Sequence, residues 1–157
     1  MKPKYEEYLQ GSTVWRGRHK GVYYELAHHG VSEYQKEGIW CAYIFLFENE
    51  CPDFDKFFRE DEVTQITENS PYHITNNYWG IPDMGFKGGI TYYENKQGWN
   101  YKEGKHTRVI KIGCDYNHSW DADAGYPDTL ESVREDTVTL IDNYMNAGYK
   151  LTLAEAA

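Results

Sequence analysis

The sequence lacks any apolar run long enough to cross a membrane, which takes about 18 residues or more. Its longest apolar run, Ile39 to Phe47, has nine residues. The first twelve residues, MKPKYEEYLQGS, also lack the apolar segment of a secretion signal. We therefore expect an intracellular, cytoplasmic protein that has no contact with a membrane.

Cysteine is scarce, and the common nucleotide-binding signatures are missing. Cys41, Cys51 and Cys114 are odd in number and none of them belongs to a CxxC pair, so we expect reduced thiols rather than disulfides or a zinc knuckle. Neither GxGxxG nor GxxxxGK[ST] occurs. The sequence therefore supports neither a dinucleotide-binding fold nor a P-loop.

Basic residues are too few for a general nucleic-acid binder, since the net charge is −9, and we expect no direct binding of nucleic acid. The charge is unevenly distributed. Seven acids and two bases lie from Glu48 to Glu62, and eight acids and one base lie from Asp115 to Asp142. From Lys87 to Lys111 the balance reverses, with six bases and two acids.

What the sequence has in abundance is aromatic residues, at 17% of the chain, although mean hydropathy is −0.80. A length of 157 residues indicates one domain over 1–157, with 1–12 set apart as a candidate loose segment. Apolar alternation predicts five strands, of which 39–47 should be central and buried on both faces. These strands are 14–20 (a strand or a turn), 21–28, 39–47, 90–94 and 108–114.

The intervening segments are rich in turn formers. We expect a hairpin between strands 21–28 and 39–47, a long loop over 76–89 and a hairpin loop over 96–105. Short strands are candidates at 63–66 and 72–74.

Two helices are expected. Asp53 is placed to cap a short helix that presents Phe54, Phe57 and Phe58 on one face. Thr129 to Asn146 predicts a long amphipathic helix, with Asp128 and Glu131 as a capping box and Gly148 as its stop; residues 149–153 follow as an edge strand or a packed tail. Without βαβ alternation, the fold class is α+β, a mainly antiparallel sheet packed by the long C-terminal helix and the short Phe-rich helix.

The stretch RVIKIGCDYNHSWD, Arg108 to Asp121, is the strongest candidate site. We expect Gly113 to end a strand and to be followed by Asp115, His118 and Asp121 in a turn. These three side chains have three interpretations: metal ligands, a histidine acid–base group oriented by carboxylates, or a hydrogen-bonded structural knot. The sequence leaves all three open, and we assign none of the residues as catalytic or as a metal ligand.

A second candidate segment lies earlier in the chain. Gly88 and Gly89 allow close backbone approach to a phosphate, and Lys87 beside them favours an anion. Arg108 and Lys111, on opposite sides of a regular strand, and Arg16 and Arg18 are further basic contacts. Nearby rings suit stacking on a base. The candidate ligand contacts are Lys87, Gly88, Gly89, Thr91, Tyr92, Arg108, Asp115, His118, Trp120 and Asp121.

Two motifs, Lys87-Gly-Gly-Ile-Thr-Tyr92 and Gly113-Cys-Asp-Tyr-Asn-His-Ser-Trp-Asp121, resemble a family of small phage-encoded proteins of largely unassigned role. Members carry HGG-[LI]-TY and then GFD-x-x-H-x-x-D before a closing helix. Gly38 to Tyr43 is similar to their G-x-x-C-[GA]-Y strand, and the resemblance covers Trp15 to Met145. Lys87 stands where the family usually has histidine, which bears on any chemistry that needs an imidazole there.

The resemblance implies a phage anti-defence protein acting in the infected bacterial cell. We expect it to bind and sequester a small phosphorylated nucleotide signal, a cyclic oligonucleotide or a cyclic ADP-ribose type, without catalysis or a cofactor. Such pockets are commonly shared between subunits, so a homo-oligomer is expected. Two alternatives stay open: an acidic, nucleic-acid-mimicking inhibitor of a host nuclease of the anti-CRISPR kind, and a hydrolase using Asp115, His118 and Asp121, with or without a metal.

Overall fold

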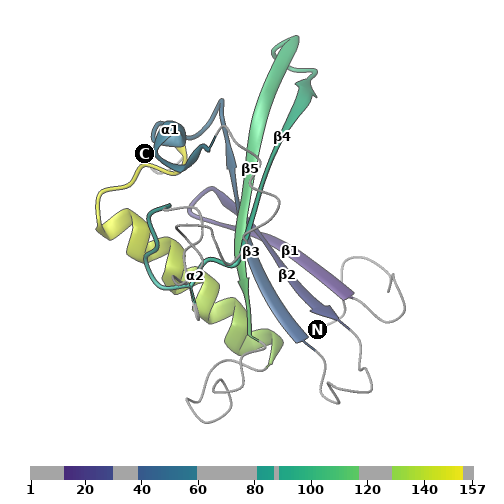
Figure 1. The fold of residues 1–157 in the computed structure, drawn as a ribbon, viewed down its shortest axis with the longest axis vertical. Helices are drawn as coiled ribbons and strands as arrows, with labels where there is room; N and C mark the ends of the chain where they lie inside the picture. The colour runs from purple at the N-terminus through teal and green to yellow at the C-terminus, as the bar shows by residue number, and fades with distance from the viewer. Residues whose placement is uncertain (1–12, 30–38, 60–80, 87–88, 117–128, 154–157) are drawn as a thin grey trace, which may run out of the picture.

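The computed structural model describes residues 13–29, 39–59, 81–86, 89–116 and 129–153. It contains a five-stranded antiparallel sheet, a long helix near the C-terminus and a short helix after the third strand (Figure 1). The predicted α+β class, with a mainly antiparallel sheet packed by these two helices, is confirmed. The predicted strands at 63–66 and 72–74 and the segment 1–12 lie outside the described residues.

The strands are β1 (Thr13–His19), β2 (Val22–His29), β3 (Ile39–Phe47), β4 (Tyr92–Asn100) and β5 (Lys105–Asp115). They lie in the order β1-β2-β3-β5-β4, and each neighbouring pair is antiparallel. Lys20 and Gly21 join the first two strands with positive φ angles of 50° and 84°, as a two-residue hairpin turn requires.

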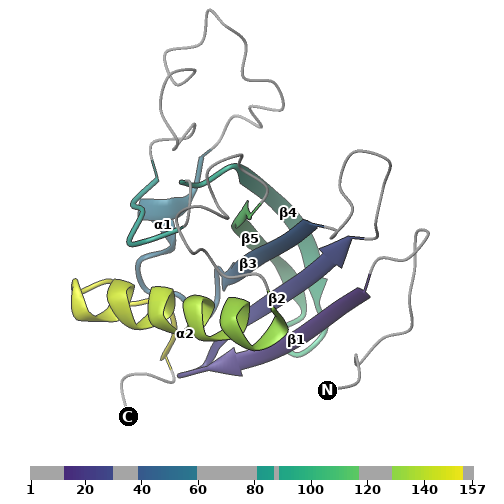
Figure 2. The same ribbon diagram turned by 90° about the horizontal axis from the view of Figure 1, so that it is seen from below.

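Helix α2 (Leu130–Asn146) packs across one face of the sheet (Figure 2). Its apolar positions repeat at helical spacing, so they form one stripe that is buried against the sheet. The buried helix residues are Val133, Thr137, Leu140, Ile141 and Tyr144. The strands contribute the facing residues of the same core, which include Leu26, Ala42, Ile44, Leu46, Ile110 and Ile112.

The start of α2 differs from the predicted cap by one residue. Thr129 is the N-cap, and its hydroxyl accepts the backbone N–H of Ser132 at 3.1 Å. The Ser132 hydroxyl in turn accepts the backbone N–H of Thr129 at 2.9 Å, so Thr129 and Ser132 form the capping box in place of Asp128 and Glu131. The predicted stop is confirmed, since Gly148 has a φ of 96°.

The short helix α1 (Phe54–Phe57) buries Phe54 and Phe57, while Phe58 follows as its C-cap. Asp53 occupies the N-cap position as predicted, but its side chain makes no capping hydrogen bond. Its carboxylate accepts the backbone N–H of Lys150 at 2.7 Å instead. Asp53 therefore ties the segment after α2 to the start of α1, and that segment is a packed tail in which Leu151 is buried.

The β4–β5 hairpin is longer than predicted. The expected loop over 96–105 is wrong: β4 continues through Asn100, and only Tyr101 to Gly104 form the turn. Asn100 closes this turn by accepting the backbone N–H of Glu103 with its side chain and that of Gly104 with its carbonyl. Gly113 does not end the following strand either, since it pairs with both Tyr43 and Tyr92 inside the sheet. In the described part of the chain, no helix is long and apolar enough to span a membrane.

Candidate functional site

The two faces of β3 differ, which corrects the prediction of a strand buried on both sides. β3 is central as predicted. Ala42, Ile44 and Leu46 are fully buried towards α2, whereas Tyr43 and Phe45 alternate with them and are half-buried. Strand register places a set of charged and aromatic side chains on that second side. We call this set the polar face: Arg16, Glu25, Tyr43, Phe45, Tyr92, Glu94 and Lys111.

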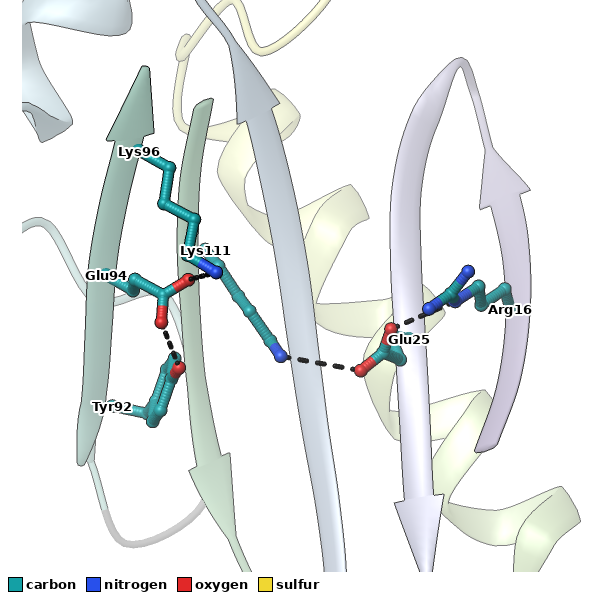
Figure 3. Close-up of polar contacts among 6 residues, drawn as sticks. All are labelled: Arg16, Glu25, Tyr92, Glu94, Lys96 and Lys111. Atoms are coloured by element: carbon teal, nitrogen blue, oxygen red, sulfur yellow. Dashed lines mark hydrogen bonds and ion pairs between the residues drawn. The ribbon is translucent and has the colours of Figure 1, made fainter. Parts of the chain in front are cut away.

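Glu25 is the centre of the polar face. It is only 7% exposed, and each of its carboxylate oxygens accepts from a cation. The Nε of Arg16 donates to one oxygen at 3.0 Å, and the Nζ of Lys111 donates to the other at 3.4 Å (Figure 3). A buried carboxylate is costly unless it is paired in this way. Three charges on three strands therefore form one chain across the sheet.

Lys111 also lies over aromatic rings. Its Nζ is 4.2 Å from the ring centroid of Tyr43, 5.3 Å from that of Tyr92 and 5.6 Å from that of Phe45. An ammonium over a ring face is attracted by the negative charge of the π system. The Lys111 side chain extends from β5 to β3, and its contact with Glu25 spans β3 (Figure 3), so one lysine connects the charge chain to the ring cluster.

Glu94 marks the other end of the polar face. The Tyr92 hydroxyl donates to its carboxylate at 2.8 Å, and the Lys96 Nζ lies 3.1 Å away. Partial burial tends to raise the pKa of Glu94, but these two donors and nearby Lys111 outweigh it and lower the pKa. Burial raises the pKa of Tyr92 to about 12 and moves that of Tyr43 above its usual range. Both phenols are therefore hydrogen-bond donors at neutral pH.

The structure brings the two predicted segments together. Gly89 is buried with a φ of 87°, and the Thr91 backbone N–H donates to the Gly113 carbonyl at 3.0 Å. Tyr92 lies opposite Gly113, and Asp115 follows two residues later on the same face as Tyr92. The two predicted segments therefore meet where Thr91 and Tyr92 lie beside Gly113.

Arg108 is not part of this group. It lies on the opposite side of β5 from Lys111, as the alternation predicts, and its guanidinium carbon is 4.7 Å from the ring centroid of Phe58. Arg108 and Asp115 are seven residue steps apart along the extended strand, which corresponds to about 23 Å. The side chain of Arg108 therefore lies near the end of α1 and not on the polar face.

Half of the predicted contacts lie outside the described residues, namely Lys87, Gly88, His118, Trp120 and Asp121. The three interpretations of Asp115, His118 and Asp121 depend on these positions and stay predictions. Among the described residues, no group of three or more His, Cys, Asp or Glu side chains is arranged to hold a metal ion.

Sequence reasoning missed Glu25 and Tyr43, and it weighed Lys111 and Arg16 only as isolated bases. One signal was present: Glu25 is an acid in the middle of the otherwise apolar and aromatic run VYYELA. An acid at a buried strand position needs a cation on a neighbouring strand. Which cation it finds depends on strand order, which the local pattern does not contain.

No protein-family model matches the chain, and no curated protein or solved structure is similar enough to count as a match.

Proposed function

We propose that the polar face binds a small phosphorylated nucleotide and holds it without chemical change. The observation that carries the proposal is the position of Lys111, whose ammonium lies within 6 Å of the rings of Tyr43, Phe45 and Tyr92. A base stacked on such rings gains about 1–3 kcal/mol, and an adjacent ammonium attracts phosphate. The resemblance of the two motifs to phage proteins supports the proposed biological role. In that role a phage protein binds a nucleotide immune signal inside a bacterial cell and so lowers its free concentration.

The polar face as a set is neutral, because Arg16 and Lys111 balance Glu25 and Glu94, and Lys96 beside Glu94 adds one positive charge at its edge. The contact proposed for an anionic guest is the ammonium of Lys111. Lys111 has only 23% of its side chain exposed, so this charge acts in partly desolvated surroundings, where an electrostatic attraction is stronger than in water. A phosphate that reaches Lys111 can share it with Glu25 while the base contacts the rings.

Sequestration fits the described groups better than hydrolysis. Glu25 is held by two cations, and the raised pKa values of Tyr43 and Tyr92 keep both phenols protonated at neutral pH. A general base needs a group that accepts a proton near the working pH. The hydrolase alternative rests on Asp115 together with His118 and Asp121, and only Asp115 is described.

The test is a binding measurement followed by recovery of the ligand. Cyclic oligonucleotides and cyclic ADP-ribose isomers are screened by thermal shift, and the Kd of any that stabilise the protein is measured by calorimetry. The bound ligand is then released by heat and analysed by mass. We expect at least one nucleotide to raise Tm and to return intact. Cleaved ligand supports the hydrolase, and co-purification of a basic nuclease without any nucleotide effect supports the acidic inhibitor.

Variants assign the binding to the polar face. Lys111→Met and Tyr92→Leu are each expected to weaken binding at least about tenfold, since each removes one of the two proposed contacts. Lys102→Met, in the exposed β4–β5 turn, is the matched control and should bind as the wild type does. Circular dichroism confirms that each variant is folded. Unchanged affinity in both polar-face variants would place the ligand elsewhere.

A further inference from the structure

The rings near Lys111 form two separate pairs on one side of the sheet. Tyr43 and Tyr92 are one pair, with ring centroids 5.1 Å apart. Strand register places Tyr23 of β2 directly opposite Phe45 of β3, and the centroids of these two rings are 4.9 Å apart. All four rings are half-buried, so each keeps part of its surface exposed. The ring surface therefore extends beyond the polar face to Tyr23.

The ammonium of Lys111 lies close to both pairs. Tyr43 and Phe45 are two residues apart on β3, which corresponds to about 6.8 Å. The Lys111 Nζ is 4.2 Å from the ring centroid of Tyr43 and 5.6 Å from that of Phe45, so it reaches one ring of each pair. An anion held at this ammonium consequently has ring surface beside it in two neighbouring rows of the sheet.

The spacing of the two rows suits two bases. It is about twice the 3.4 Å rise between stacked bases of one DNA strand, so bases placed on the two pairs stack on protein rings and not on each other. Aromatic side chains on a sheet face bind successive bases of single-stranded RNA in this manner. Two bases joined through phosphate therefore match a ring pair, a cation and a second ring pair.

Acidic side chains around the ring pairs limit the size of the guest. Arg18 flanks one end, but its guanidinium faces the Glu50 carboxylate at 4.0 Å. Lys96 flanks the other end and is paired with Glu94 at 3.1 Å. Asp115 adds an acid on the same side of the sheet. A longer polynucleotide would bring its further phosphates to these carboxylates, so the arrangement favours a short guest over a single-stranded polymer.

We propose that the guest of the polar face is a small dinucleotide, in which two bases are joined through phosphate, and that Tyr23 and Phe45 hold the second base. The inference rests on the proposed function, in which the first base contacts Tyr43 and Tyr92 and the phosphate contacts Lys111. It selects cyclic and linear dinucleotides over guests with a single base, such as cyclic ADP-ribose.

The test compares ligands that differ in their number of bases. Calorimetry gives the Kd of cyclic di-AMP and of cyclic AMP, and likewise of cyclic di-GMP and of cyclic GMP, so that each comparison keeps the same base. We expect at least one two-base ligand to bind at least about tenfold more tightly than its one-base counterpart, because it gains a second stacked base. Cyclic ADP-ribose has two phosphates and one base, and it should bind no more tightly than cyclic AMP.

Variants assign the second base to its ring pair. Tyr23→Leu should weaken binding of the two-base ligand at least about tenfold, and binding of the one-base ligand less than about twofold. Tyr23→Phe keeps the ring and is the matched control, with the affinity of the wild type for both ligands. Phe45→Leu removes the other ring of the pair and should weaken two-base binding more than one-base binding. Because the two variants remove different rings, a folding defect of one, seen by circular dichroism, leaves the other to decide.

The contrary results separate this inference from the proposed function. One-base and two-base ligands of equal affinity, or equal losses for both kinds of ligand in Tyr23→Leu and Phe45→Leu, would contradict a second base site and leave the proposed function standing. Absence of binding by every nucleotide would remove the proposed function together with this inference. Tighter, salt-dependent binding of a longer single-stranded oligonucleotide would overturn the inference and assign the rings to a polymer.

Discussion

The ring of Tyr43 packs edge-on against that of Tyr92, with centroids 5.1 Å apart, across the position of Gly113. The two tyrosines belong to strands that are not neighbours, since β5 lies between them. They meet because Gly113 has no side chain to separate them. A glycine in the interior of a strand usually weakens it, and here the missing side chain allows the ring cluster under Lys111 to form.

Gly113→Ala is expected to destabilise the protein by about 1–3 kcal/mol, as overpacking typically does. A Cβ at this position would collide with the Ala42 carbonyl oxygen and the Tyr43 ring. Gly98→Ala, in β4, is the matched control, because a Cβ there meets no atom within 4 Å; its stability should be unchanged or raised by up to about 1 kcal/mol. Urea denaturation measures both variants, and equal effects would contradict the packing role of Gly113.

The local sequence pattern was enough to predict the elements of the fold that bury apolar side chains. The run from Ile39 to Phe47 is a strand with the predicted bounds, and the helical spacing from Val133 to Tyr144 is the buried stripe of α2. For α2 the burial follows from periodicity alone. For 39–47 the continuous apolar run predicted the strand, but not that one of its faces is only half-buried. The cap of α2 was misplaced by one residue because Asp128, Thr129, Glu131 and Ser132 offer two overlapping capping boxes, and only the backbone geometry decides between them.

Local pattern failed where pairing across strands decides the structure. Residues 96–105 contain glycine, asparagine and lysine and resemble a loop, but hydrogen bonding to β5 makes most of them strand. The contact between Lys111 and Glu25 joins residues 86 positions apart, and it depends on β5 lying next to β3. Nothing in either segment alone indicates that order, so the polar face could not be predicted as one site.

A double-mutant cycle on Glu25 and Lys111 should show strong coupling. Lys111→Met leaves the buried Glu25 carboxylate with one cation and is expected to destabilise the fold by about 1–3 kcal/mol, less than for a fully buried pair because Lys111 remains partly exposed. Glu25→Gln in the Lys111→Met background should cost much less than Glu25→Gln alone. Lys96→Met, whose side chain is 69% exposed beside Glu94, is the control and should change stability by less than about 0.5 kcal/mol. Additive effects of the two polar-face substitutions would contradict a direct charge pair.

Asp142 should make acid stability pH-dependent. His19 donates to its carboxylate at 2.8 Å and Lys20 lies 3.0 Å away, so the β1–β2 turn is joined to α2. These contacts, His19 first, hold the pKa of Asp142 below its ordinary value of 3.8. A lowered carboxyl pKa stabilises the fold above the unfolded-state pKa, and that contribution disappears as the pH falls through the folded-state pKa.

Asp142→Asn is therefore expected to lower the stability at neutral pH by less than about 1 kcal/mol, since His19 and Asp142 are partly exposed and their interaction is screened by solvent. The difference in Tm between the variant and the wild type should shrink towards zero as the pH falls below 3.8, and 1 M salt should reduce it at neutral pH. Glu135→Gln, an exposed acid on the same helix, should show no comparable pH-dependent difference. A gap in Tm that persists at the lowest pH would contradict the electrostatic origin.

The three thiols should be unreactive in the folded protein. Cys41, Cys51 and Cys114 are free and buried, and burial raises the pKa of Cys41 to about 11, that of Cys51 to about 12 and that of Cys114 above its usual range. At pH 8 only about one Cys41 in a thousand is ionised, and the thiolate is the reactive form. The folded protein should therefore react slowly.

With Ellman's reagent at that pH we expect slow reaction of the native protein and rapid reaction of three thiols in urea. Lys102→Cys, in the exposed hairpin turn, supplies a control thiol that should react at once in the native state. Native wild-type protein reacting as fast as this control would mean that the sheet opens readily around its buried cysteines.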